Sequence, residues 1–188
     1  MSSTKEKLEE AKFFLEQLER NYRNSPEVRY FLSAYISAAR SVTWVMRSEY
    51  QDIPSWEEWY VSQAPDNNKA QFLKAINDLR VKSVKQGPTQ FHYRVEFQIP
   101  AEKITKEIEE YFQKAQGKKL TGELRVAENI DAEKEIIVSG NKIEGLFIFE
   151  RAYIEVDLFP DEDILDVCKR YYSMIEELVF TCEELFSG

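Results

Sequence analysis

The side chains best suited to bind a ligand lie in one short basic stretch, Arg80-Val81-Lys82-Ser83-Val84-Lys85. An arginine can hold a phosphate through two parallel hydrogen bonds, and lysines add positive charge beside it. Residues 66–87 carry five basic and two acidic side chains, in a chain whose net charge is −9. The sequence therefore predicts candidate phosphate contacts at Arg80, Lys82 and Lys85. The alternative is that all three are ordinary solvated charges on a helix.

Proton transfer needs a group that titrates near neutral pH, and the chain has one histidine, His92. Apolar and polar residues alternate over 91–99, which predicts a half-buried strand with His92 on its polar side. The chain could bring His92 back to Arg80 and so pair a base with a phosphate-binding group. The alternative is a half-exposed histidine without a role. Lys85 has an ordinary pKa of about 10.4, so it would bind phosphate without exchanging protons.

Other candidate groups are few. The three tryptophans could stack on nucleic-acid bases. Because Trp44, Trp56 and Trp59 stand at helical spacing among apolar residues, we expect them in the core. Cys168 and Cys182 are 14 residues apart, which on one helix is about 21 Å, so no disulfide joins them and Cys168 is expected to be a buried apolar residue.

Metal, cofactor and membrane functions have no support in the sequence. Two cysteines and one histidine cannot supply a four-ligand zinc site without carboxylates. The chain has no P-loop, dinucleotide glycine fingerprint, HExxH motif or nucleophile elbow, so we expect no metal and no cofactor. No stretch approaches the ~20 apolar residues of a membrane span, and the charged N-terminus is not a secretory signal. We expect a cytoplasmic protein.

Helical periodicity dominates the first half of the chain. It predicts a helix opened by a capping box, Ser3–Glu6, and a second helix from Ser25-Pro26 to about Arg47. A short helix follows a second capping box, Ser55–Glu58, and another runs from Asp66 to Gly87-Pro88. The apolar faces expected to be buried are Leu8, Ala11, Leu15 and Leu18, then Phe31, Leu32, Tyr35, Ala38, Ala39, Val42 and Val45, and then Phe72, Leu73, Ile76 and Leu79.

The pattern changes to strands after Pro88. The predicted elements are strands at 91–99, 120–126, 135–139 and 143–158, a helix at 101–116, a hairpin turn at 139–142, and a last helix from Pro160-Asp161 to about Leu185. The expected fold class is therefore α+β. It is a mainly helical up-and-down bundle of residues 1–88 and 160–188, with an α+β insertion at 89–159 that holds a small antiparallel sheet and one helix. A two-domain split near residue 88 is the alternative.

Two segments, Tyr30–Trp44 and Phe72–Pro88, resemble the HEPN superfamily of small helical bundles. The resemblance covers roughly residues 5–88, with the last helix as a further candidate, and leaves out the β-rich segment. In that family a late helix carries an arginine, usually a polar residue after it, and a histidine four to six residues further on. Active members cut RNA without metal, and two protomers bring their copies of the motif together.

This chain departs from the family motif. Arg80 matches the arginine, but Val81 takes the place of the polar residue, and Lys85, Gln86 and Gly87 fill the window of the histidine. The resemblance therefore implies a degenerate site that binds phosphate but does not cleave.

The expected function is a non-catalytic RNA-binding or protein-interaction module that acts as a homodimer. A weak metal-independent endoribonuclease that uses Arg80 with Lys85 or His92 is one alternative. A structural adaptor with no affinity for nucleic acid, offering an edge strand of its β-rich segment to a protein partner, is another.

Overall fold

The computed structural model describes residues 1–22, 26–85, 87, 89–98, 134–138, 141–145 and 148–187. Within them the chain is mainly helical, as the sequence predicts. The chain divides into two compact units. Unit 1 comprises Met1–Tyr93 and Tyr153–Gly188, and unit 2 comprises Arg94–Ala152. The boundaries expected from sequence, 88/89 and 159/160, lie a few residues away from the observed ones.

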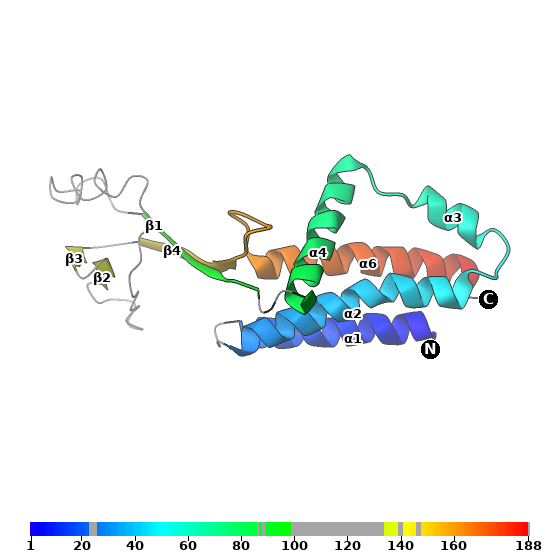
Figure 1. Cartoon of the computed structure of the whole chain (residues 1–188), viewed down its shortest axis with the longest axis horizontal. Helices are drawn as coiled ribbons and strands as arrows, with labels where there is room; N and C mark the ends of the chain where they lie inside the picture. Colours follow the sequence, from blue (N-terminus) through cyan, green and yellow to red (C-terminus); the bar gives the residue numbers. More distant parts are fainter. Residues whose placement is uncertain are drawn as a thin grey trace. The chain divides into compact units, whose positions relative to one another are not determined.

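Unit 1 is a bundle in which α1, α2 and α6 run side by side, with α3 and α4 beside them (Figure 1). The start of α1 and the end of α6 lie at the same end of this bundle. The helices are α1 (Ser3–Arg20), α2 (Glu27–Tyr50), α3 (Trp56–Ser62), α4 (Asn67–Lys85) and α6 (Ile164–Phe186).

The core of unit 1 is built from the apolar faces of these helices, because each helix presents side chains at 3–4-residue spacing toward its neighbours. The predicted face of the first helix is confirmed, since Leu8, Ala11, Leu15 and Leu18 are all buried. Buried residues on α2 and α6 include Leu32, Tyr35, Ala38, Ala39, Val42, Ile164, Val167, Cys168, Tyr171, Ile175, Val179 and Cys182. Burying each large apolar side chain contributes about 1.5–3 kcal/mol, so this core holds the helices that carry the candidate site.

The starts of the helices differ from the predicted ones. The N-cap of α1 is Ser2, whose hydroxyl accepts a hydrogen bond from the Lys5 backbone N–H at 3.1 Å, so the capping box expected at Ser3–Glu6 is wrong by one residue. Ser55 precedes α3 in a left-handed conformation (φ 69°) and makes no side-chain cap bond, so that capping box is wrong as well. The predicted cap of α4 is confirmed, because Asp66 Oδ1 accepts from the Lys69 N–H at 2.9 Å.

The last helix begins at Ile164 rather than at Pro160-Asp161. Asp163 is its N-cap and accepts a hydrogen bond from the Leu165 N–H at 2.9 Å. Asp163 also accepts a hydrogen bond from the Tyr22 hydroxyl, which itself accepts from the Ile154 N–H at 2.7 Å. Tyr22 therefore fixes the helix start to the end of α1, and this tertiary contact decides which aspartate caps the helix.

The described strands are β1 (His92–Gln98), β2 (Lys134–Val138), β3 (Asn141–Gly145) and β4 (Ile148–Glu155). β1 pairs with β4, and β2 pairs with β3 as an antiparallel hairpin whose last pair is Val138 with Asn141. The single strand expected over 143–158 is wrong, since β3 and β4 are separate strands. The helix expected at 101–116, the strand expected at 120–126 and the turn residues 139–140 lie outside the described residues.

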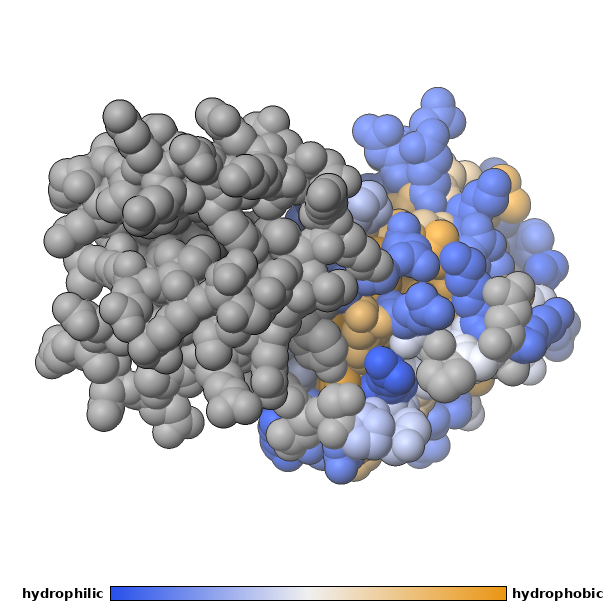
Figure 2. Space-filling model, turned by 60° about the vertical axis from the view of Figure 1, so that its left-hand side comes forward, coloured by the Kyte–Doolittle hydropathy of each residue, from blue (hydrophilic) through white to orange (hydrophobic). Residues whose placement is uncertain are grey.

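Hydrophilic residues dominate the described surface on the face that Figure 2 shows, and apolar residues emerge only in small groups between them. None of the helices in the described part of the chain is both long and apolar enough to cross a membrane.

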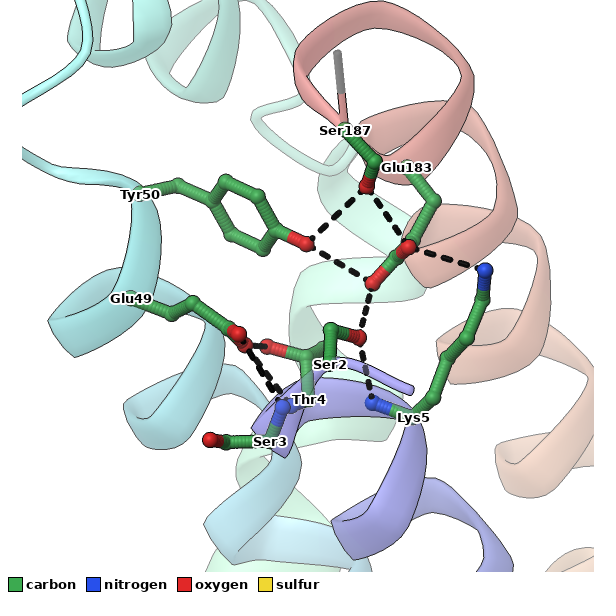
Figure 3. Close-up of polar contacts among 8 residues, drawn as sticks. All are labelled: Ser2, Ser3, Thr4, Lys5, Glu49, Tyr50, Glu183 and Ser187. Atoms are coloured by element: carbon green, nitrogen blue, oxygen red, sulfur yellow. Dashed lines mark hydrogen bonds and ion pairs between the residues drawn. The ribbon is translucent and has the colours of Figure 1, made fainter.

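The two ends of the described chain are held together by a buried carboxylate, Glu183, near the end of α6 (Figure 3). Its carboxylate accepts hydrogen bonds from the hydroxyls of Ser2, Tyr50 and Ser187, and Lys5 Nζ lies 2.9 Å from its Oε2. Burial raises the pKa of Glu183, but these hydrogen bonds outweigh that effect and lower it to about 2. This cluster of Ser2, Lys5, Tyr50, Glu183 and Ser187, called the Glu183 cluster below, joins α1, α2 and α6.

Candidate functional site

The predicted phosphate contacts lie in the last two turns of α4. Ile76 and Leu79 are buried on this helix and fix it against the rest of unit 1. Arg80 follows Leu79 and is half-buried, whereas Lys82 and Lys85 are exposed. Positive side chains are favourable at this position, because the C-terminal end of a helix carries partial negative charge. Of the three predicted phosphate contacts, Arg80 is therefore the least exposed to solvent, and the two lysines lie on the surface.

Arg80 shares its surroundings with a second arginine. Its Nε is buried and has no hydrogen-bond partner among the described residues. Arg80 and Arg40, the latter on α2, both lie near enough to the Tyr171 phenol for their positive charges to lower its pKa. Burial of Tyr171 on α6 is the larger effect, and the net result raises its pKa to about 12. Arg40, Arg80 and Tyr171 thus come from three helices, and both arginines lie within range of a charge interaction with the phenol; we call this group the Arg80 cluster.

The guanidinium groups of the Arg80 cluster are free of ion pairs within the described part of the chain. Arg40 Nη1 donates to Thr43 Oγ1 at 3.0 Å on its own helix. Neither Arg40 nor Arg80 lies within 4 Å of a described carboxylate, whereas other cations of unit 1, such as Lys169, do. A buried donor without a partner costs about 1–3 kcal/mol, and an anion would recover this cost through charge-assisted hydrogen bonds. The cluster is therefore suited to bind an anion.

Lys82 borders a second feature, an open cavity of about 240 Å³ at the end of α4. Its lining residues are Leu79, Lys82, Gly87, Thr89, Gln90, Val156, Asp157 and Leu158. Gly87, one of the lining residues, adopts a positive φ of 106°, a conformation that glycine tolerates best.

The structure places His92 beside this cavity. His92 Nε2 lies 2.7 Å from Oδ1 of Asp157, one of the lining residues. A carboxylate bound to one ring nitrogen fixes the orientation of an imidazole, which is the usual arrangement around a general base. Among the described contacts His92 makes none with Arg80, so the described geometry does not show the pair that would restore the family motif.

Of the three tryptophans, Trp56 lies in the core as expected and Trp59 is partly buried against it. Trp56 is fully buried and stacks on Tyr60, with ring centroids 4.8 Å apart, and Trp59 packs edge-on against Phe186 at 5.4 Å. The expectation for Trp44 is wrong. Its side chain on α2 is 64% exposed. The 3–4 spacing of α2 places position 44 on the face opposite the buried Val42 and Met46, a distinction that apolar residue type alone did not reveal.

The cysteines behave as the sequence predicts. Cys168 and Cys182 are both buried and neither forms a disulfide. Burial raises the pKa of the Cys168 thiol well above its ordinary value, so it is not a reactive nucleophile. Within the described residues no three His, Cys, Asp or Glu side chains come together in a way that could hold a metal ion.

Sequence reasoning missed Arg40, Tyr171 and Asp157 as members of these sites. Arg40 stands within the segment Tyr30–Trp44, where a cation amid serines and apolar residues was a possible signal. Tyr171 stands in the predicted last helix with no signal that links it to Arg80, and the pairing of Asp157 with His92 depends on a contact between residues 65 positions apart in sequence.

Comparison with known proteins gives one relationship. A family model described as bacteriophage lambda protein ea47 matches residues 1–185 of the chain. A search of curated proteins and a search of solved structures found no match.

Proposed function

The chain belongs to the bacteriophage lambda protein ea47 family, and we propose that it acts as a non-catalytic RNA-binding module. RNA phosphates would be held by Arg80, Lys82 and Lys85 on α4, with Arg40 as an added contact from α2. The observation that carries this proposal is the Arg80 cluster, in which the buried Nε of Arg80 has no described partner and the charge of Arg40 acts on the same phenol.

The charges around the Arg80 cluster support a polyanion as ligand. Lys82 and Lys85 add positive charge in the same two turns of α4, on the side of the helix away from Arg80, in a chain whose net charge is −9. A general electrostatic attraction to RNA is therefore absent, and binding depends on this local group of cations.

Binding without cleavage follows from the residues at the motif. Lys85, Gln86 and Gly87 occupy the positions where the resemblance to HEPN modules calls for a histidine. A lysine with its usual pKa of about 10.4 stays charged at neutral pH and does not exchange protons with a substrate. The Arg80 cluster would then stabilise phosphate charge with no base beside it.

The proposal also includes the finer architecture and a homodimer. The resemblance implies an up-and-down bundle with an α+β insertion before the last helix, and two copies that bring their Arg80 residues to a shared seam. Light scattering at micromolar concentration tests the dimer, and a strict monomer would overturn this part of the proposal.

The test of RNA binding is fluorescence anisotropy of end-labelled single-stranded RNA, in low salt with EDTA. We expect the wild-type protein to raise the anisotropy and Arg80→Ala to weaken binding by about 10-fold or more. Arg20→Ala is the matched control, because Arg20 is exposed on α1 and pairs with Glu16 at 3.4 Å. A flat wild-type trace would overturn the proposal in favour of a protein-binding adaptor. If both variants lost RNA affinity equally, the loss would be due to the change in net charge and not to the Arg80 site.

A weak metal-independent endoribonuclease is a second candidate, favoured by the His92–Asp157 pair beside the cavity at Lys82. Cleavage would appear in the same experiment as a slow fall of the anisotropy below its starting value. His92→Ala should then abolish the fall and leave initial binding unchanged. Cleavage by the His92→Ala protein at the wild-type rate would exclude His92 as the base.

A further inference from the structure

Trp44 is the largest side chain that unit 1 exposes on α2. Indole rings are usually buried at least in part, and the other two tryptophans of this chain pack into or against the core. We propose that Trp44 stacks on an unpaired base and that the ligand of unit 1 is therefore single-stranded RNA. This inference rests on the proposed function and adds the substrate class and the residue that selects it.

Trp44 shares one helix face with arginines. Arg40 and Arg47 are four residues before and three residues after it, and such positions lie next to each other on an α-helix. Arg40 belongs to the Arg80 cluster. The exposed indole of Trp44 therefore lies one turn of α2 away from a residue of the proposed anion site. The Arg47 side chain is 51% exposed and lies 3.8 Å from Glu57, which is a weak pairing.

A second exposed aromatic residue extends this face. Tyr30 is 65% exposed and stands 14 residues before Trp44, which at 100° per residue places both on the same side of α2. The two positions are about 21 Å apart along the helix axis, with Arg40 between them. Alternation of aromatic rings and cations along a surface is the pattern that proteins use to bind single strands.

The exposed face of an indole favours a single strand over a duplex. In a double helix the faces of the bases are covered by their neighbours, so a side chain on a convex helix surface cannot stack on them. A single strand can turn one base onto the ring while its phosphates reach the arginines. Trp44 would then discriminate between the two forms of RNA, whereas Arg80 would bind phosphate in either.

A second copy of the chain is a less suitable occupant of this face. In a twofold interface centred on Trp44, Arg40 and Arg47 of one copy would face the same residues of the other. Like charges brought together in this way with no anion between them are unfavourable. The positive charge beside Trp44 is instead complementary to a polyanion.

The chain supplies a matched control in Phe180. This ring is 63% exposed on α6, but its neighbours one turn away include Glu176, Glu177 and Glu184. These carboxylates repel the phosphates of RNA, so RNA should not bind at Phe180. Removing the Phe180 ring should therefore leave RNA binding unchanged. Phe180→Ala therefore separates a specific effect of Trp44 from a general loss of exposed aromatic surface.

The experiment compares the dissociation constants of a single-stranded RNA and a duplex of the same sequence for wild type, Trp44→Ala, Trp44→Phe and Phe180→Ala. We expect Trp44→Ala to weaken single-strand binding about 5- to 100-fold, the effect of losing one base–aromatic stack, and to leave duplex binding unchanged. Trp44→Phe should recover most of the affinity. Because Trp44 is exposed, the variants should unfold at the wild-type temperature.

The outcomes separate this inference from the proposed function. If wild type binds no RNA, both are overturned. If Arg80→Ala weakens binding but Trp44→Ala does not, the phosphate site stands and base stacking on Trp44 is overturned. If Trp44→Ala converts a dimer to a monomer without changing RNA affinity, Trp44 is a self-association residue and the inference is likewise overturned.

Discussion

Two polar clusters in unit 1 are built from the same kinds of interaction but differ in how completely they are satisfied. In the Glu183 cluster one buried carboxylate has four partners, the side chains of Ser2, Lys5, Tyr50 and Ser187. In the Arg80 cluster the buried Nε of Arg80 has none among the described residues.

This difference indicates different roles. A buried charge whose hydrogen bonds are all made within the protein stabilises one conformation and has nothing left to offer a ligand. A buried donor nitrogen without a partner lowers stability unless a ligand completes it, and such groups concentrate at binding sites. The comparison therefore assigns the Glu183 cluster to the stability of the fold and the Arg80 cluster to binding.

Removing the Glu183 carboxylate tests the first assignment and should have the largest effect. Glu183→Ala removes the acceptor of the Ser2 hydroxyl and leaves the Tyr50 hydroxyl with only its 3.2 Å contact to Ser187 Oγ, so we expect the free energy of unfolding to fall by about 3 kcal/mol. Urea denaturation followed by circular dichroism measures this change. A loss below about 0.5 kcal/mol would show that the cluster does not hold the helices together.

The pH dependence of stability is a second test of whether the Glu183 cluster stabilises the fold. The folded pKa of Glu183, about 2, lies below the ordinary carboxylate value, so the ionised form stabilises the fold above pH ~4.5 and this contribution is lost as pH falls toward 2. A difference of this size is worth about 3 kcal/mol. The stability gap between wild type and Glu183→Gln should therefore be widest near pH 7 and nearly closed at pH 2. A gap that stays constant over this range would contradict the lowered pKa.

A second carboxylate, Glu49, binds the N-terminal turn of α1, and removing its charge should lower stability by less than removing Glu183. Glu49 accepts hydrogen bonds from the Ser3 N–H at 3.0 Å, the Thr4 N–H at 2.8 Å and the Thr4 hydroxyl at 2.7 Å, but its own side chain is exposed. Glu49→Gln removes the negative charge from a helix N-terminus, and we expect a loss of about 1 kcal/mol. Hydrogen exchange of the amides in the first turn should accelerate in this variant. Unchanged exchange there would show that water replaces Glu49 without cost.

The helices of unit 1 could be predicted because their signal is local. The buried face of α1, Leu8 to Leu18, follows directly from 3–4 spacing. The helix starts were harder to predict, since Ser2, Ser3, Asp161 and Asp163 are all plausible caps by residue type. The choice of Asp163 depends on Tyr22, which is 141 residues away in sequence.

The candidate site could be predicted only in part, for the same reason. Arg80, Lys82 and Lys85 stand within six residues, so the sequence shows them as a group. Arg40 and Tyr171 come from other helices, and only packing brings them near Arg80. The expectation for Trp44 was wrong because it followed residue type, whereas the spacing of the predicted buried face, which includes Val42, places position 44 on the opposite side of α2.

Truncating Arg80 should change stability less than the substitutions at Glu183 and Glu49, and this makes it the sharpest test of the comparison. Its Nε has no partner to lose, so Arg80→Ala creates no newly unpaired buried group; it removes only the contacts of the aliphatic stem. We expect the free energy of unfolding to change by less than about 0.5–1 kcal/mol, measured beside Glu183→Ala in the same urea titrations. A loss of about 3 kcal/mol, equal to that of Glu183→Ala, would make Arg80 a structural residue and remove the distinction between the clusters. A small change together with weakened RNA binding would instead show that the fold tolerates the unpaired guanidinium because its partner is the ligand.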